Sequence, residues 1–233
     1  MVNTKDCWIK SNCGKYATND CDNKEEFCVK LFKLDYLFNE SLLTDNQRVR
    51  IPLRYDADGT DRENFIRLKE IETNIDTWVK GGNNLLIKSS NCGNGKTAWS
   101  IRLIQAYLDK IWHISDFSCK ALFINVPRLM LSLKDNISST NDYANHIKLN
   151  VLDADFVVWD EIGTKSVTSF EHENLLNFIN ARIEAGKSNV YTSNLDFEQL
   201  KASVGDRLYS RIVNYSEVIT FNGKDKRGLV NSH

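Results

Sequence analysis

The fold is decided by one stretch of the chain, Asn84-Leu85-Leu86-Ile87-Lys88-Ser89-Ser90-Asn91-Cys92-Gly93-Asn94-Gly95-Lys96-Thr97. It begins as an apolar strand and ends in a glycine-rich turn that closes with Gly-Lys-Thr. In such a turn, backbone N–H groups converge on the β-phosphate, the lysine reaches the β- and γ-oxygens, and the threonine hydroxyl ligates Mg²⁺. The stretch therefore predicts a site for ATP or ADP with Mg²⁺.

The predicted phosphate loop is imperfect when taken alone. The pattern G-x-x-x-x-G-K-[ST] expects glycine at the position of Ser90, so support has to come from other parts of the chain. The residues expected to line the nucleotide in this loop are Asn91, Cys92, Gly93, Asn94, Gly95, Lys96, Thr97 and Ala98.

A second stretch, Asp155-Phe156-Val157-Val158-Trp159-Asp160-Glu161, supplies that support. It has the pattern of a buried strand that delivers two carboxylates at its C-terminal end, as a Walker B strand does. Asp160 is expected to hold Mg²⁺ through water, and Glu161 to orient or deprotonate the attacking water. For this stretch alone, an ordinary strand that ends in an acidic turn is the alternative.

Length, composition and charge limit the classes of protein to consider. The 233 residues, 42% of them hydrophobic, are enough to bury one sizeable core and to carry a small appendage. The formal net charge is −1, so any contact with nucleic acid has to come from a local basic surface. The amino terminus is polar, and no apolar run approaches the ~20 residues that a membrane span needs. We expect a soluble, cytoplasmic protein with no membrane partner.

Cysteines cluster near the amino terminus, at Cys7, Cys13, Cys21 and Cys28. A short polar segment cannot bury a core of its own, and in a reducing compartment a tetrahedral Cys₄ site would supply the missing folding free energy. We therefore predict Zn²⁺ in a small module over residues 1–46. The spacing lacks the C-x2-C knuckle of strong zinc motifs, so scattered thiols are the alternative. Cys92 and Cys119 are expected to be small buried residues.

From residue 84 onward, strand patterns and helical patterns alternate along the chain. Such alternation predicts a parallel sheet with helices on both faces, a three-layer α/β fold in a domain over residues 47–233. The expected strands are 85–88, 121–126, 156–159, 189–192 and 217–221. The expected helices are 31–43, 62–79, 97–111, 128–134 and 170–185, with a polar hinge over 44–50.

Two further patterns narrow the class. The strand over 189–192 leads to Asn194, whose amide would lie beside the γ-phosphate if this strand separates the phosphate-loop strand from the acidic strand. Further on, Arg207 and Arg211 are spaced i and i+4, on one face of a predicted helix. An arginine in this position suits action in trans, on the γ-phosphate bound by a neighbouring subunit. A solvated basic helix is the alternative.

Together these motifs resemble the AAA+ ATPases of the DnaC/DnaI helicase-loader and IstB group, over about residues 48–227. The resemblance rests on Gly93-Asn94-Gly95-Lys96-Thr97, Asp160-Glu161-Ile162-Gly163, Thr192-Ser193-Asn194-Leu195, Gly205-Asp206-Arg207 and Ser210-Arg211-Ile212. It implies a five-stranded parallel P-loop core without a C-terminal lid domain, and a slow, assembly-dependent ATPase. The catalytic residues that it implies are Lys96, Glu161, Asn194, Arg211 as the arginine finger and Arg207 as its companion. Arg227 would be a sensor 2 residue that contacts nucleotide.

The same resemblance implies partners. Copies of the chain would assemble head to tail into a ring or an open spiral. The assembly would bind single-stranded DNA and deliver or open a hexameric replicative helicase, which the cysteine module would contact. The candidates for DNA contact are Lys134, Lys148 and the loop 165–169, with Tyr143 and Phe170 as stacking candidates.

Two other functions stay open, and the compact size suggests a bacteriophage version of the group. A transposase-helper ATPase of the IstB kind shares nearly all the core motifs and differs in its amino-terminal segment. A non-hydrolysing adaptor would use nucleotide only as a structural switch, although Glu161 argues against it.

Overall fold

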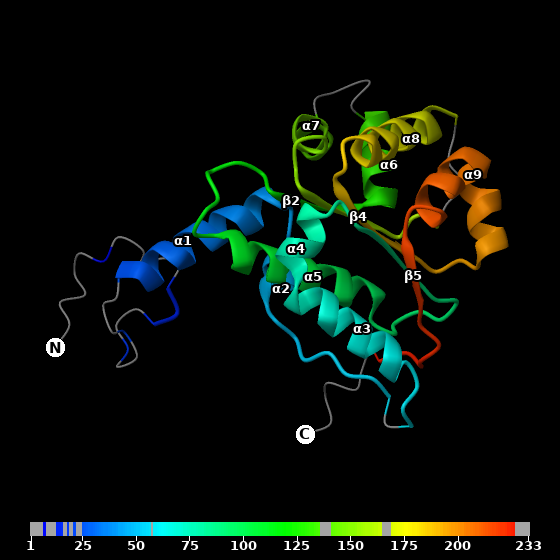
Figure 1. Cartoon of the computed structure of the whole chain (residues 1–233). Helices are drawn as coiled ribbons and strands as arrows, with labels where there is room; N and C mark the ends of the chain where they lie inside the picture. The colour runs from blue at the N-terminus through cyan, green and yellow to red at the C-terminus, as the bar shows by residue number, and fades with distance from the viewer. Residues whose placement is uncertain are drawn as a thin grey trace.

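The computed structural model describes residues 7, 13–15, 18, 21, 25–56, 58–135, 141–164 and 169–226 (Figure 1). Its centre is a five-stranded sheet in the order β2-β3-β4-β1-β5, in which all neighbouring strands are parallel. The strands are β1 (Asn84–Lys88), β2 (Ala121–Asn125), β3 (Phe156–Asp160), β4 (Ser188–Ser193) and β5 (Glu217–Thr220). The predicted parallel α/β core is confirmed.

Both faces of the sheet are apolar, and helices therefore cover both. Along β1, Leu85 and Ile87 belong to one buried cluster and Leu86 to the other, because successive side chains of a strand point to opposite faces. All five residues of β3 are buried, which is why its sequence is an unbroken apolar run up to Asp160.

The helices divide between the two faces. One face packs against α1 (Glu25–Glu40), α3 (Arg62–Thr73), α4 (Ile75–Lys80) and α5 (Lys96–Ile111). The other packs against α6 (Val126–Asp135), α7 (Asp142–Asn150), α8 (Ser169–Glu184) and α9 (Phe197–Val213). Figure 1 shows α6, α7 and α8 together at the top of the view, with α3 and α5 below the strands. No helix in the described part of the chain has both the length and the apolar composition needed to cross a membrane.

Several elements differ from those expected. The helix expected over 62–79 is two helices, because the chain leaves helical geometry at Asn74, between α3 and α4. The expected hinge holds a one-turn helix, α2 (Asp45–Arg48), which Thr44 caps together with Gln47. The helix α7 was not predicted, because only two of its nine residues are buried apolar side chains and its pattern is weak.

The end of α1 packs into the main body of the protein. Leu37 and the nearby Leu43 belong to the same buried cluster as α5 and one face of β1. Just after α1, the chain also pairs with the outer edge of the sheet, where the Phe123 N–H donates to the Ser41 carbonyl at 2.9 Å. The predicted boundary at residue 46 thus falls after a helix that shares the main core, and this division of the chain stays a prediction.

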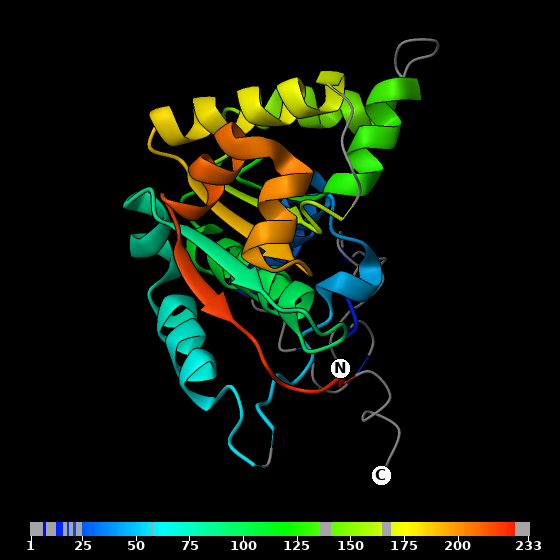
Figure 2. The ribbon, with the colours of Figure 1, turned by 90° about the vertical axis from the view of Figure 1, so that its right-hand side faces the viewer.

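The parallel sheet brings the sequence motifs to one edge. All carboxyl ends of parallel strands meet there: β1 leads into the glycine loop, β3 ends at Asp160, and β4 ends one residue before Asn194. In Figure 2, the segment 221–226 after β5 runs alongside the loop that joins β1 to α5. Strand β4 lies between β1 and β3, as the γ-phosphate position expected for Asn194 requires.

Candidate functional site: a phosphate-loop pocket

The glycine loop between β1 and α5 is closed around its own lysine. Gly93 and Gly95 have φ values of 72° and 104°, a backbone region that L-residues with side chains rarely adopt, and Gly95 begins α5. Lys96 is 7% exposed, and its Nζ donates to the Asn91 carbonyl at 2.8 Å and to Asn94 Oδ1 at 3.1 Å. The ammonium is thus held inside the loop by oxygen atoms of the loop itself, next to the start of α5, where a phosphate site would need a positive charge.

Ser89 explains how the loop forms without glycine at position 90. Its fully buried hydroxyl accepts from Asn94 Nδ2 at 2.5 Å and from the Asn91 N–H at 3.0 Å. These two bonds span the loop from inside, whereas Ser90 itself is exposed. A serine side chain at position 90 therefore meets no packing constraint that would demand glycine.

Asp160 lies beneath the loop, where β3 ends. Its Oδ1 accepts from Thr97 Oγ1 at 2.9 Å and from Thr192 Oγ1 at 2.7 Å, and the residue is 4% exposed. Burial raises the pKa of the Asp160 carboxyl, and the nearby Glu161 adds to this, although both threonine hydroxyls act in the opposite direction. A threonine hydroxyl beside a carboxylate matches the all-oxygen chemistry of Mg²⁺, so Thr97 and Asp160 could hold that ion.

Glu161 is held in a strained backbone conformation. Its φ is 62°, which costs a residue with a side chain of the order of 1 kcal/mol. The surroundings hold it there: the Glu161 N–H donates to Thr192 Oγ1 at 2.9 Å, and Asn125 Nδ2 donates to Glu161 Oε2 at 3.1 Å. With this backbone conformation the chain leaves the direction of β3 after Asp160, and Glu161 lies beside the glycine loop.

The loop, Glu161 and Asn194 line a pocket of about 450 Å³, which we call the loop pocket. This volume is in the range of small-molecule and cofactor sites. The lining residues are Ile51, Pro52, Leu53, Arg54, Cys92, Gly93, Asn94, Gly95, Lys96, Thr97, Ala98, Trp99, Glu161, Asn194 and Lys226. The predicted residues 92–98, Glu161 and Asn194 thus share the lining, and Asp160 joins them through its bond with Thr97, whereas the predicted nucleotide residue Asn91 is not among the lining residues.

Sequence reasoning missed one wall of the loop pocket and two supporting side chains. The segment 51–54 is held there by α5, where Arg102 donates to the Ile51 carbonyl. Thr192 and Asn125 hold the acidic pair; Thr192 lies in the Thr-Ser-Asn motif but was assigned no role, and Asn125, the last residue of β2, has no motif around it. Only the parallel register, which pairs Asn125 with Asp160, reveals Asn125 as a neighbour.

Arg207 and Arg211 do not line the loop pocket. Both follow a kink at Gly205, whose φ is 75°, in the last part of α9. Arg211 Nη1 donates to Tyr215 Oη at 3.1 Å, and its guanidinium lies 5.4 Å from the centre of the Tyr215 ring. Arg207 is exposed. Arg227 lies outside the described residues.

The cysteine predictions fare less well. Cys92 is exposed in the glycine loop, contrary to expectation, because a residue at the tip of such a loop has no core to enter; Cys119 is buried as expected. The zinc prediction gains no support: no group of three or more metal-ligating side chains comes together among the described residues, although Cys7, Cys13, Cys21 and Cys28 are all described. The zinc module stays a prediction.

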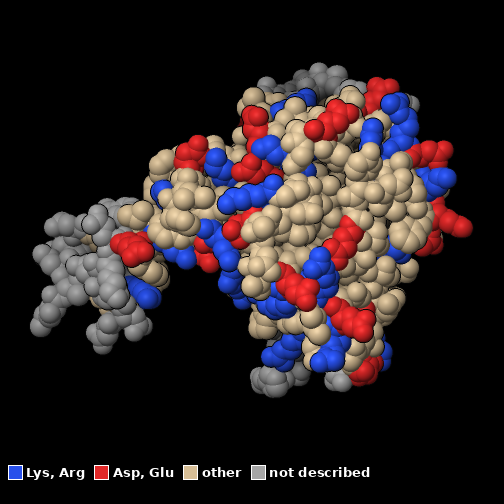
Figure 3. Space-filling model, viewed as in Figure 1, with Lys and Arg blue, Asp and Glu red and all other residues tan. Residues whose placement is uncertain are grey.

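The DNA-contact candidates are only partly described. Lys134 and Lys148 are exposed, on α6 and α7, while residues 165–168 and the Phe170 side chain lie outside the description. The Tyr143 ring is already stacked under Arg128, whose guanidinium lies 4.0 Å from the ring centre. On the face drawn in Figure 3, both signs of charge are interspersed. These DNA contacts stay predictions.

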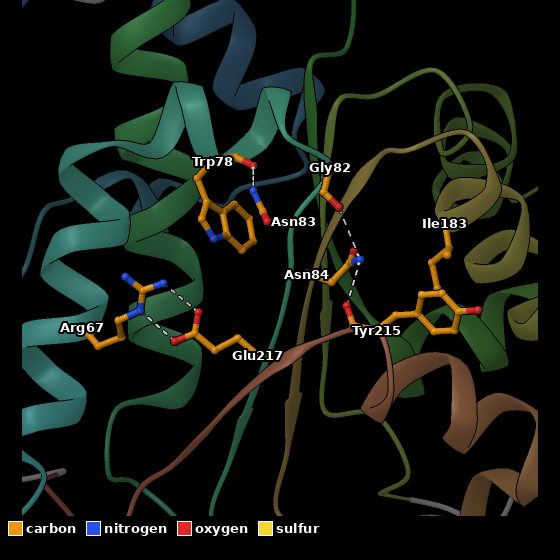
Figure 4. A pocket seen from close by; sticks show the side chains of 8 residues that line it. All are labelled: Arg67, Trp78, Gly82, Asn83, Asn84, Ile183, Tyr215 and Glu217. Carbon is orange, nitrogen blue, oxygen red and sulfur yellow. Dashed lines mark hydrogen bonds and ion pairs between the residues drawn. The ribbon is translucent and has the colours of Figure 1, made fainter.

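A second pocket, of about 550 Å³, opens at the opposite edge of the sheet, where β1 and β5 begin (Figure 4). We call it the strand-start pocket. Its lining residues are Arg67, Trp78, Gly82, Asn83, Asn84, Ile183, Tyr215 and Glu217. Arg67 and Glu217 form a two-pronged ion pair at 2.7 and 2.9 Å, and Asn84 Nδ2 donates to the carbonyls of Gly82 and Tyr215.

Comparison with known protein families agrees with the geometry of the loop pocket. A family model described as IstB-like ATP binding protein matches residues 60–232. The chain belongs to this IstB-like family. Its sequence is 27% identical over 114 residues to the replicative helicase loader DnaC of Buchnera aphidicola subsp. Baizongia pistaciae (strain Bp). That match covers 48% of the chain and 46% of the relative, so it spans less than half of the relative's length.

Solved structures show the fold of this IstB-like chain in other proteins. A DnaC helicase loader superposes with a TM-score of 0.60 at 16% identity, over 77% of the chain and all of the solved one. DnaI superposes with a TM-score of 0.59 at 18% identity, over 82% of the chain and all of the solved one. Domain III of the replication initiation protein DnaA from Thermotoga maritima gives 0.55 at 18% identity, over 82% and 68%. The predicted DnaC/DnaI-like AAA+ fold is confirmed.

Proposed function

We propose that this protein is an ATP-dependent loader of a hexameric replicative DNA helicase, which works as a head-to-tail assembly on single-stranded DNA. The observation that carries the ATPase part is that Lys96, Thr97, Glu161 and Asn194 line one pocket, with Asp160 hydrogen-bonded to Thr97. The similarity to a DnaC helicase loader supports the choice of partner.

Each residue of the site has a chemical role in this proposal. Lys96 neutralises charge that develops on the phosphates, while Thr97 and Asp160 hold Mg²⁺, which screens the same charge when it is bound. Glu161 accepts the proton of the attacking water, with Asn125 orienting its carboxylate through the bond at 3.1 Å. Asn194, at the pocket wall, donates toward the γ-phosphate position.

Hydrolysis should depend on assembly, because within one subunit no arginine side chain of the described C-terminal helix lines the loop pocket. Arg211 would complete the pocket of the adjacent copy, and Arg207 would support that contact. The contact with Tyr215 keeps the Arg211 guanidinium extended at the surface, so little conformational entropy is lost on reaching a neighbour. Such a heterologous contact generates rings or open spirals.

Two variants test the ATPase part. Lys96→Ala should abolish nucleotide binding, as measured by calorimetric titration with Mg·ATP. Arg211→Ala should bind Mg·ATP like the wild type and lose about 10³-fold in turnover at protein concentrations where the wild type is assembled. Wild-type turnover of the Arg211 variant in an assembled state would falsify the trans finger. Failure of the wild type to bind Mg·ATP would remove the ATPase proposal altogether.

The choice of partner is tested separately. Co-purification of the full chain with a hexameric helicase, rather than with a transposase, distinguishes a loader from a transposase helper, the second candidate that the match to the IstB-like family favours. Absence of turnover at any protein or DNA concentration would instead indicate a non-hydrolysing adaptor. A metal analysis of the same purified protein decides whether the amino-terminal cysteines bind Zn²⁺.

A further inference from the structure

The segment 221–226 is tied directly to the glycine loop, and its last residue, Lys226, lines the loop pocket; we call this segment the wall. At its start, the Phe221 N–H donates to the Lys88 carbonyl at 2.8 Å, and at its end the Lys226 N–H donates to the Gly93 carbonyl at 2.8 Å. The backbone of Lys226 is therefore anchored on one of the two loop glycines. Any change in the loop on binding a ligand acts directly on this residue.

Two aspartates hold the same segment from the other side. Asp61 accepts from the N–H groups of Asn222 and Gly223, at 2.9 and 2.7 Å. Asp56 accepts from the Lys224 N–H at 3.2 Å. A side chain at position 223 would come within 2.8 Å of both carboxylates, so only glycine fits between them. The wall is thus built by specific contacts over its whole length.

The Lys226 side chain makes two polar contacts with the segment 54–56. Its Nζ donates to the Arg54 carbonyl at 3.0 Å and lies 3.2 Å from Asp56 Oδ1. An ammonium carries three N–H donors, and these two contacts engage two of them. The residue lines the loop pocket together with Lys96.

We propose that Lys226 is a nucleotide ligand whose ammonium binds an anionic oxygen of the polyphosphate. The inference rests on the nucleotide-binding part of the proposed function and concerns the same pocket. The loop pocket then grips the phosphates with two lysines: Lys96 from within the glycine loop, and Lys226 from the segment that follows β5. A charge-assisted bond of this kind is worth about tenfold in affinity.

Asp56 gives the proposal a distinguishing consequence. In the ligand-free protein its carboxylate neutralises Lys226, and it competes with phosphate for the ammonium. Removing that carboxylate while keeping its shape should leave the ammonium more available. Lys226 and Asp56 therefore have opposite effects on affinity, whereas two halves of a purely structural ion pair would have the same effect.

The experiment is a calorimetric titration of the full chain with Mg·ATP and Mg·ADP. Lys226→Met, which keeps most of the apolar stem, should weaken the affinity for both nucleotides about tenfold. Lys226→Arg should retain most of it. Lys224→Met removes the same charge from the same segment at an exposed position, and should stay within about twofold of the wild type. Asp56→Asn, whose remaining oxygen still accepts from the Lys224 N–H, should bind as tightly as the wild type or more tightly.

Three results would overturn the inference: wild-type affinity in Lys226→Met, an equal loss in Lys224→Met, or an equal loss in Asp56→Asn. An equal loss of affinity in Asp56→Asn would mean that Lys226 supports the segment 221–226 and does not bind the nucleotide. Melting curves for all four variants separate unfolding from lost affinity, and Lys226→Arg keeps the test decisive if Lys226→Met is unstable. Failure of the wild type to bind either nucleotide would instead overturn the proposed function.

Discussion

The two ends of strand β1 open into pockets of similar size and opposite character. The strand-start pocket, of about 550 Å³, is larger than the loop pocket, of about 450 Å³. In the strand-start pocket the charged side chains pair with each other, Arg67 with Glu217. In the loop pocket, Lys226 pairs with Asp56, whereas Lys96 donates to a backbone carbonyl and an amide oxygen and Glu161 accepts from the Asn125 amide. Volume does not distinguish the two pockets, whereas the state of their polar groups does.

Backbone strain also differs between the two pockets. Gly93, Gly95 and Glu161 have positive φ and line the loop pocket, and Gly82, with φ 64°, lines the strand-start pocket; of these four, only Glu161 has a side chain that makes this conformation costly. Desolvation acts there too, since burial raises the pKa of Asp160. At the strand start, the hydrogen bonds that Arg67 donates to Glu217 raise the pKa of the Arg67 guanidinium, as expected of a satisfied surface pair. A folded chain tolerates strain and buried charge where a ligand will later use them.

The largest effect expected from this contrast is on turnover. Glu161→Gln should lower the ATP turnover of the assembled protein by about 10²–10⁴-fold and leave Mg·ATP binding intact, because the amide cannot accept the proton of the attacking water. Glu217→Gln makes the same change in the strand-start pocket and should leave turnover unchanged. Steady-state phosphate release measures both. Comparable losses of ATP turnover in the two variants would show that the two pockets do not differ in their part in hydrolysis.

A second effect links binding with stability. Because the folded-state pKa of Asp160 is raised, its charged form disfavours folding; this cost is absent below the unfolded-state pKa, grows as the pH rises from that value to the raised pKa, and is constant above it. Asp160→Asn should therefore raise the melting temperature of the ligand-free protein at neutral pH while it lowers Mg²⁺-dependent affinity for ATP by about 10²-fold. The stability gain should shrink as the pH is lowered. A variant that melts below the wild type at neutral pH would contradict the desolvation argument.

Tyr215 lines the strand-start pocket and also contacts Arg211, the residue proposed to complete the loop pocket of an adjacent copy. Tyr215→Phe keeps the ring beside the guanidinium but removes the hydroxyl acceptor. We expect a loss of about 2–10-fold in assembly-dependent turnover, with unchanged affinity for Mg·ATP. Tyr209→Phe, on the same helix as Arg211, is the control and should leave assembly-dependent turnover unchanged. If Arg211→Ala reduces turnover and Tyr215→Phe does not, Tyr215 has no part in positioning Arg211.

The smallest effect concerns the ion pair of the strand-start pocket. The side chains of Arg67 and Glu217 are 46% and 38% exposed, so solvent screens their attraction. A double-mutant cycle with Arg67→Met and Glu217→Gln, followed by urea unfolding, should give a coupling free energy below about 1 kcal/mol. The coupling should fall further in high salt. A coupling free energy several times larger would contradict the description of Arg67 and Glu217 as an ion pair screened by solvent.

Much of the site was predictable, because its motifs are contiguous in sequence. The glycine loop needs Gly93 and Gly95 next to Lys96, and the acidic pair needs Asp160 next to Glu161, so short-range patterns reveal both. The position of Asn194 followed once the strand alternation was recognised. The zinc prediction, by contrast, relied on cysteines spaced too widely for local geometry to draw them together.

The residues that were missed come from distant parts of the chain. Asn125 supports Glu161 through the pairing of β2 with β3, and Thr192 supports Asp160 through the pairing of β3 with β4. Lys226 reaches the loop only because two aspartates hold the segment after β5 against it. No local pattern reveals the roles of these three residues, although Thr192 lies in a recognised motif, since each acts through partners that are at least 30 positions away.

The sequence by itself determined the strand–helix alternation, the phosphate loop and the two strand-end carboxylates, because backbone conformation and short-range hydrogen bonding dictate these over a few residues. Tertiary structure alone decided which polar groups would be paired and which would remain for a ligand. That choice depends on the order of the strands and on the segments 51–54 and 221–226, contacts whose free energy appears only when the whole sheet has formed.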